Sequence, residues 1–147
     1  MKIDLNDFPF DYGNRESNPT ASELGRSFTL RNDSKFIVKR WSIDKVVFKN
    51  REEQRCDYLI QVITSIKKPT YFWIELKGKD IVKACRQITN TIELVIVSNR
   101  ATHEARIITS GTNKIEIRTK EFVGLDNLMR RNGGRLKTYT TEKTETI

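Results

Sequence analysis

Two carboxylates and an amine stand at the ends of two neighbouring apolar segments. Asp57 lies at the start of the segment Cys56–Thr64, and Glu75 and Lys77 lie at the end of the next one, which begins at Thr70. Two carboxylates can hold Mg²⁺, which binds a phosphate oxygen and lowers the pKa of a bound water. A lysine beside them can orient that water or offset negative charge in the transition state. The three residues together therefore indicate metal-assisted hydrolysis of a phosphate ester.

A β-hairpin is needed to bring these side chains together. Both segments are rich in β-branched and aromatic residues, and loop 65–69 separates them. Pairing that is symmetric about residue 67 places Asp57 opposite Lys77 and residue 59 opposite Glu75. Residues two apart on a strand share a face, so Asp57 is expected on the same face as Glu75 and Lys77. A slip of one residue would move Asp57 to the other face, so the prediction depends on the register.

The residues around this set resemble the PD-(D/E)XK nuclease superfamily. The motif comprises residues 56–60 (CDYLI) and residues 71–80 (YFWIELKGKD), and it continues with Ala84, Gln87 and Ile88 in the next helix. The similarity covers about residues 41–98. It is closest to the small single-domain members that are likened to Holliday-junction resolvases and restriction endonucleases.

The resemblance implies a magnesium- or manganese-dependent nuclease that hydrolyses phosphodiester bonds in DNA, acting as an endonuclease. By this resemblance, Asp57 and Glu75 are the metal ligands, together with the carbonyl of Leu76. Lys77 is the catalytic base that positions the water. The same similarity predicts a restriction-endonuclease-like core within the α/β class, with flanking helices around a mixed central sheet.

Further candidate residues extend this site. Many members of the family carry an additional acidic ligand on an N-terminal helix, for which Glu23 is the candidate here, and Asp44 is a second candidate accessory acid. Members often have a proline directly before the first aspartate, where this chain has Cys56. The candidates for contacts with the nucleic acid are Arg55, Lys79, Lys83, Arg86 and Gln87.

The elements that must position these residues follow from hydrophobic periodicity. Apolar residues on one helical face, with Asp80 as the N-cap, predict a helix over residues 80–91. The apolar run at residues 93–98 predicts a buried strand, so the helix would be a crossover between parallel strands. Shorter strands are expected at residues 28–30, 35–41, 46–48, 106–109 and 114–120.

Three regions are predicted along the chain. Residues 1–27 are rich in Asp, Asn, Ser and Gly and are expected to form an irregular arm, with at most one helical turn near residues 22–25. Residues 28–129 are expected to form the single nuclease-like domain. Residues 130–147 contain Gly133 and Gly134 and a Thr/Lys/Glu-rich end, and a mobile basic tail is expected there.

The composition narrows the class of protein. The chain has 147 residues with 27 Lys and Arg against 19 Asp and Glu, giving a net charge of +8, which favours a polyanionic partner such as DNA. Two cysteines and one histidine exclude a tetrahedral Cys/His zinc site. Without an apolar run of membrane-spanning length or a secretory signal, we expect a cytoplasmic protein with no membrane partner.

Two alternatives remain open at the level of sequence. A catalytically silent nucleic-acid-binding or protein-interaction module could keep the same fold, although the three key residue types are all present. An RNA nuclease is the other alternative, because nothing in the chain distinguishes RNA from DNA. For a chain of this length we expect no separate DNA-recognition domain, so a homodimer is expected to widen the basic surface, and the need for a protein partner is left open.

Overall fold

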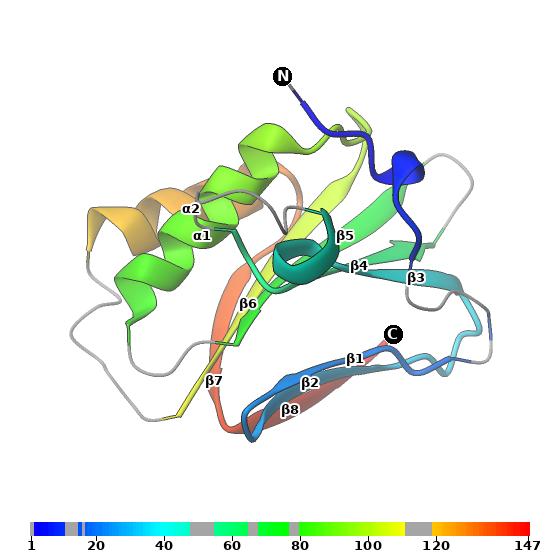
Figure 1. Ribbon diagram of the computed structural model, residues 1–147, viewed down its shortest axis with the longest axis horizontal. Helices are drawn as coiled ribbons and strands as arrows, with labels where there is room; N and C mark the ends of the chain where they lie inside the picture. Colours follow the sequence, from blue (N-terminus) through cyan, green and yellow to red (C-terminus); the bar gives the residue numbers. More distant parts are fainter. Residues whose placement is uncertain are drawn as a thin grey trace.

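Three layers make up the protein (Figure 1). The computed structural model describes residues 2–10, 15, 17–47, 55–64, 68–76, 80–110 and 119–147. A five-stranded sheet forms the middle layer, two α-helices cover one face, and a three-stranded sheet covers the other. The predicted mixed α/β class is therefore confirmed.

Both sheets are mixed. The large sheet has the order β3-β4-β5-β6-β7, with bounds Ile37–Ser42, Tyr58–Ile63, Pro69–Leu76, Thr102–Thr109 and Leu136–Thr140. Its first three strands are antiparallel, and β5, β6 and β7 are parallel. The small sheet has the order β1-β2-β8, with bounds Thr20–Glu23, Arg26–Arg31 and Glu142–Thr146. The strand β8 runs parallel to β2.

The helices begin at side-chain caps. Helix α1 spans Ile81–Leu94, and the Asp80 side chain accepts a hydrogen bond from the amide of Lys83 at 2.9 Å, so the predicted N-cap is confirmed. Helix α2 spans Lys120–Arg131 and is capped by Thr119. Two shorter helical segments are η1, Leu5–Asp7, and η2, Ile43–Val47.

The crossover that contains α1 differs from the prediction in the strand that follows the helix. Helix α1 connects β5 to the parallel strand β6, so the predicted crossover and parallel pair are confirmed. The strand expected at residues 93–98 is wrong, because Glu93 and Leu94 end α1 and Val95 makes only an isolated bridge with Ile3. Val95 continues the apolar face of the helix and is fully buried. An apolar run this short fits either a strand or a buried helix end.

The outer elements also differ from expectation. The irregular arm contains η1 and β1, and residues 22–25 form the end of a hairpin rather than a helical turn. The strand expected at 46–48 is wrong at residues 46 and 47, which belong to η2, and residue 48 lies outside the described residues. Of the strand expected at 114–120, residues 114–118 lie outside the described residues and Lys120 begins α2.

The C-terminal segment expected to be a mobile tail is built into both sheets. Strand β7 pairs with β6 in the large sheet, and β8 pairs with β2 in the small sheet. The segment is polar because these strands lie at sheet edges, where one face stays exposed, and its threonines suit extended backbone. Polar composition was therefore a misleading sign of disorder here.

Two apolar layers hold these elements together. Between the large sheet and the helices lie side chains such as Trp73, Leu59 and Ile88, and between the two sheets lie Phe28, Phe72 and others. Successive residues of β5 alternate between these layers, which is why residues 71–76 are all buried. None of the helices in the described residues is long and apolar enough to cross a membrane.

Candidate active site

The hairpin β4–β5 brings Asp57 and Glu75 together. The last ladder pair is Tyr58 with Ile74, so Asp57 lies one step further on, opposite Glu75. The pairing is shifted by two residues from the predicted register, which had placed Glu75 opposite residue 59. A shift by an even number of residues preserves the face, so the prediction that the two carboxylates share a face is confirmed.

Backbone amides hold both carboxylates in place. The amide of Asp57 donates to Glu75 Oε1 at 3.0 Å, and the amide of Leu76 donates to Asp57 Oδ2 at 2.8 Å. These two hydrogen bonds cross between the ends of the strands and fix the relative orientation of the carboxylates. Glu75 is buried, with 1% of its surface exposed. A buried glutamate beside a second carboxylate is costly for folding, which is unusual unless the site has a use.

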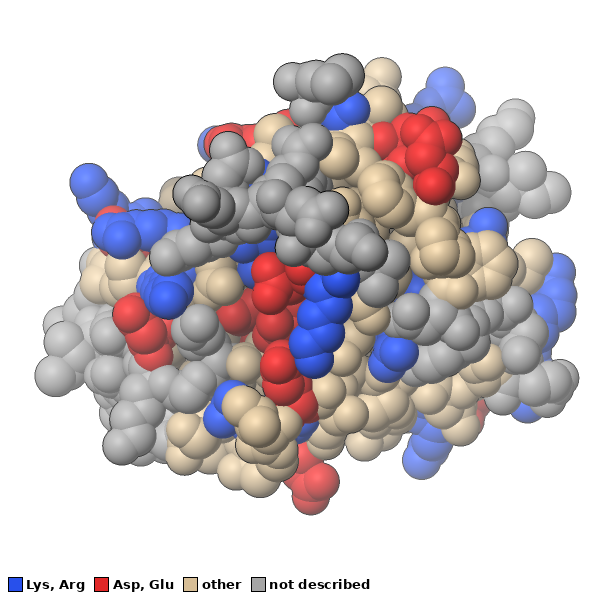
Figure 2. Space-filling model, in the orientation of Figure 1, with Lys and Arg blue, Asp and Glu red and all other residues tan. Residues whose placement is uncertain are grey.

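A pocket of about 270 Å³ opens over this pair. Its lining residues come from six elements or their ends: Glu23, Leu24, Arg26, Asp44, Asp57, Glu75, Leu76 and Gln87. The two accessory acids predicted from sequence, Glu23 and Asp44, thus line the same pocket as the central pair. Glu23 lies at the end of β1 rather than on a helix, and Asp44 lies in the first turn of η2. Figure 2 shows acidic side chains gathered on one face between the short helical turn and the small sheet.

The electrostatics of the pocket oppose ionisation of Asp57. Burial raises its pKa from 3.8 to about 6, and the negative charges of Glu23 and Asp44 add to this rise. The hydrogen bond from the Leu76 amide acts in the opposite direction. A cation in this pocket would relieve the repulsion between the carboxylates.

Gln87, one of the candidates for contacts with the nucleic acid, reaches the pocket from α1. It is buried with 8% exposed, and its Nε2 donates to the carbonyl of Arg55 at 3.1 Å. Its Oε1 is buried and has no hydrogen-bond partner among the described residues. This oxygen is therefore an unsatisfied acceptor in a pocket that already contains several carboxylate oxygens. Such an arrangement suits a bound cation or a hydrogen-bond donor.

The other predicted contact residues are not brought together. Arg55 is buried with 2% exposed, Lys83 is half-buried, and Arg86 pairs with Glu121 of α2 at 3.3 Å. Arg86 lines a different groove, between α1 and α2. The predicted catalytic residue Lys77 and the predicted contact Lys79 lie outside the described residues.

Two pocket residues, Leu24 and Arg26, were missed at the level of sequence. They flank Gly25 in the turn between β1 and β2, where Glu23 pairs with Arg26. A glycine in the second position of a two-residue turn, between two short β-favouring runs, was the available signal. Reading residues 22–25 as a helical turn concealed it.

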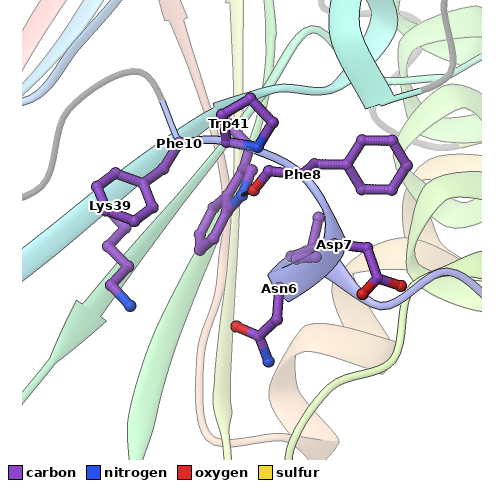
Figure 3. Close-up of a pocket in the computed structure, with 8 residues that line it drawn as sticks. Asn6, Asp7, Phe8, Phe10, Lys39 and Trp41 are labelled. Atoms are coloured by element: carbon purple, nitrogen blue, oxygen red, sulfur yellow. Dashed lines mark hydrogen bonds between the residues drawn. The ribbon is translucent and has the colours of Figure 1, made fainter.

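A second pocket, of about 330 Å³, lies where the N-terminal segment crosses β3 (Figure 3). Phe10 contacts Trp41 edge to face with ring centroids 6.2 Å apart, and Lys39 Nζ lies 5.2 Å from the centre of the Phe10 ring. Figure 3 shows Phe8 directed away from these rings. The single carboxylate in this pocket, Asp7, gives it no paired acids, so it lacks the donor set for divalent-metal chemistry.

Comparison with known proteins adds no assignment, since no family model, curated protein or solved structure matches this chain. The chemistry of the pocket is therefore the basis for a functional proposal.

Proposed function

We propose that this protein is a magnesium- or manganese-dependent nuclease of the PD-(D/E)XK type that cleaves phosphodiester bonds within DNA. The observation that carries the proposal is the placement of Asp57 and Glu75 opposite each other at the end of the β4–β5 hairpin, in one pocket. A restriction-endonuclease-like core is part of the proposal. It is supported by the antiparallel hairpin followed by the β5–α1–β6 crossover.

The donor set suits Mg²⁺. Within the described residues, no three His, Cys, Asp or Glu side chains are close enough to form a metal cage. Mg²⁺ is commonly held by only one or two carboxylates, with waters and substrate phosphates completing its shell. Asp57 and Glu75 would hold the ion, and the proposed third protein ligand is the carbonyl of Leu76. Once bound, the ion would lower the pKa of a water and offset charge on the phosphate.

The chain supplies the remaining roles. The Leu76 amide keeps Asp57 oriented, and Gln87 Oε1 offers an acceptor to a water or to a donor on the substrate. Glu23 and Asp44 are placed to accept hydrogen bonds from waters in the same pocket. Lys77, two residues after Glu75, is proposed to position the attacking water and to stabilise the transition state.

DNA is proposed as the substrate because of charge. The net charge of +8 favours a polyanion, and association should weaken steeply as salt displaces protein from the phosphates. A homodimer would provide one such pocket for each strand of a duplex. The dimer and a cytoplasmic location remain parts of the proposal.

Plasmid cleavage tests the proposal directly. Purified protein is incubated with supercoiled plasmid in Mg²⁺, in Mn²⁺ and in EDTA, next to the variants Glu75→Gln and Lys77→Ala. We expect nicking with either metal, none in EDTA, and none with either variant. Glu93→Gln is the matched control, because Glu93 is an exposed carboxylate on α1 that lies outside this pocket.

The outcomes separate the candidate functions. Cleavage of RNA but not DNA under the same conditions would replace the substrate class while keeping the site. Salt-sensitive DNA binding without cleavage in either metal would identify a silent binding module. Wild-type rates for both Glu75→Gln and Lys77→Ala would show that the activity does not come from this pocket.

A further inference from the structure

The β1–β2 hairpin brings an exposed leucine to the rim of the carboxylate pocket. Glu23 pairs with Arg26, so Leu24 and Gly25 form a two-residue turn. The Leu24 side chain is among the lining residues of the pocket, and 83% of its surface is exposed. Of the large apolar side chains in the described residues, it has the greatest exposure.

The backbone at this position is unfavourable for leucine. Leu24 has φ 48° and Gly25 has φ 81°, so both turn residues lie in the left-handed region. A turn of this kind favours Asn or Asp followed by Gly, because these residues tolerate positive φ. Positive φ costs free energy for a leucine, and a side chain that stays exposed gains little from burial to offset that cost. An outlier of this kind beside a pocket points to a role in binding.

The hairpin holds Leu24 firmly. The hydroxyls of Thr20 and Thr29 are 2.9 Å apart across the two strands, and a guanidinium nitrogen of Arg40 donates to the carbonyl of Thr20. Ala21 and Phe28 are fully buried against the large sheet. The turn therefore projects from a well-packed part of the hairpin, which holds Leu24 in a fixed position.

Arg26 supplies a cation directly beside this tip. It lines the same pocket, and its buried Nε has no hydrogen-bond partner among the described residues. A guanidinium presents donors in a planar fork that matches a phosphate. The rim thus combines an apolar side chain and a phosphate-binding group next to the acids proposed to hold the metal.

We propose, building on the nuclease function above, that Leu24 is a wedge that enters between two stacked bases beside the phosphate to be cleaved. Apolar side chains that enter base steps unstack them and kink the duplex, and the cost is smallest where pairing is already weak. Arg26 would bind a phosphate next to the opened step. The preferred substrate class is then duplex DNA with an easily opened step, such as a mismatch or a branch point.

Base unstacking can be measured without cleavage. A fluorescent adenine analogue whose emission is quenched by stacking is placed beside a mismatch in a short duplex, and binding is measured in Ca²⁺ in place of Mg²⁺. We expect emission to rise when the wild type binds and to stay unchanged with Leu24→Asn. Asparagine suits the turn, so this variant is expected to fold at least as well as the wild type.

Affinity and cleavage give a second readout. Leu24→Asn should bind and cut the mismatched duplex about tenfold less well, because the contact with an unstacked base is lost, yet treat single strands as the wild type does. Val123→Asn is the matched control, since Val123 is an exposed apolar residue on α2 outside this pocket. Arg26→Gln should weaken binding to both kinds of DNA.

The outcomes distinguish this inference from the function on which it rests. Metal-dependent cleavage with equal emission for wild type and Leu24→Asn would overturn the wedge and leave the nuclease intact. An equal loss of binding and cleavage by Leu24→Asn on duplex and single-stranded DNA would also overturn the wedge. A change in the oligomeric state of the DNA-free Leu24→Asn variant would overturn it as well. If the wild type neither binds nor cuts DNA in any metal, both proposals fail.

Discussion

Two groups of partly or fully buried carboxylates in the described residues differ in how the protein compensates their charge. In the first group, Arg106 is 2% exposed and donates to Glu145 at 2.6 and 3.1 Å and to Glu104 at 3.1 Å. Its third nitrogen, Nη1, donates to the carbonyls of Ala105 and Arg135. In the second group, Asp57 and Glu75 share a pocket with two further acids, Glu23 and Asp44.

The pKa directions express this difference. Burial alone would raise the pKa of Glu145, but the hydrogen bonds and charge of Arg106 bring it below its usual value. Burial raises the pKa of Asp57 to about 6, and the neighbouring acids reinforce the shift. A buried charge that the protein satisfies itself contributes to the fold. Acids that raise one another's pKa weaken the fold, and groups of this kind cluster at functional sites.

Removing Arg106 should have the largest effect on stability. Arg106→Leu leaves the partly buried Glu104 and Glu145 beside an apolar residue and without their cation, and breaking such a pair typically costs up to about 3–5 kcal/mol. The loss of stability should be greatest at β8, because the ion pair of Glu145 with Arg106 connects β8 to the large sheet. Urea unfolding followed by circular dichroism measures it. Activity per folded molecule should not change, and a loss below about 1 kcal/mol would contradict this account of the cluster.

Asp57→Asn should separate activity from stability. Nuclease activity should fall by at least ~100-fold, because the ligand charge is lost. The metal-free protein at pH 7 should become more stable by about 1–3 kcal/mol, because a buried charge is removed while an oxygen remains for the Leu76 amide. Urea unfolding in EDTA and plasmid nicking in Mg²⁺ measure the two quantities. Destabilisation in EDTA would mean that the carboxylate of Asp57 supports the fold as Glu145 does.

A divalent ion should stabilise the acidic pocket and leave the Arg106 cluster unaffected. At a concentration ten times the dissociation constant, binding to the folded state alone adds about 1.4 kcal/mol to the free energy of unfolding. Thermal unfolding in Ca²⁺ or Mn²⁺ should therefore shift upward for the wild type and for Glu104→Gln. The shift should vanish for Glu75→Gln. An equal shift in all three proteins would place the ion elsewhere.

Local signals predicted the core of the site. The hairpin, the Asp80 cap and the parallel crossover follow from short-range patterns. The predicted shared face of Asp57 and Glu75 was correct although the register differs by two residues, because side chains on a strand alternate with a period of two. The exact pairing was not predictable, because the loop begins one residue earlier than its composition indicated and Pro69 already belongs to β5. Turn boundaries depend on tertiary packing as well as on residue type.

Long-range structure was beyond the sequence patterns. Helix α2 buries only Leu125 and Met129, and its middle contains Gly124, so its sequence favours a helix weakly and packing against α1 must supply the rest. The strand β8 is polar throughout, and its place beside β2 depends on the contact between Glu145 and Arg106, far apart in sequence. The wedge candidate Leu24 was hidden for the same reason, since its meaning comes from the pocket beside it.

The smallest expected effect comes from His103, a buried base on the helix-facing side of the sheet. Trp73 Nε1 donates to His103 Nδ1 at 3.0 Å, and the two rings stack with Tyr71 beside them. Burial lowers the pKa of His103 below 6.5. Protonation of Nδ1 would set its N–H against the N–H of Trp73, so the folded state resists it. Between the lowered pKa and 6.5, the unfolded chain binds more protons than the folded protein.

The free energy of unfolding should therefore fall as the pH drops from 6.5 toward the lowered pKa of His103. Asp57 acts in the opposite sense, because its pKa in the folded state, about 6, exceeds the ordinary value of 3.8. Between these two pH values the folded state binds more protons than the unfolded chain, so the free energy of unfolding falls as the pH rises. The Asp57→Asn background removes this opposing slope. Urea unfolding midpoints are measured from pH 5 to 8 in EDTA for Asp57→Asn and for the double variant Asp57→Asn/His103→Asn. The difference between the two isolates the contribution of His103, because asparagine can accept the hydrogen bond from Trp73 but does not titrate. Identical slopes in the two backgrounds would show that the charge state of His103 has no influence on folding.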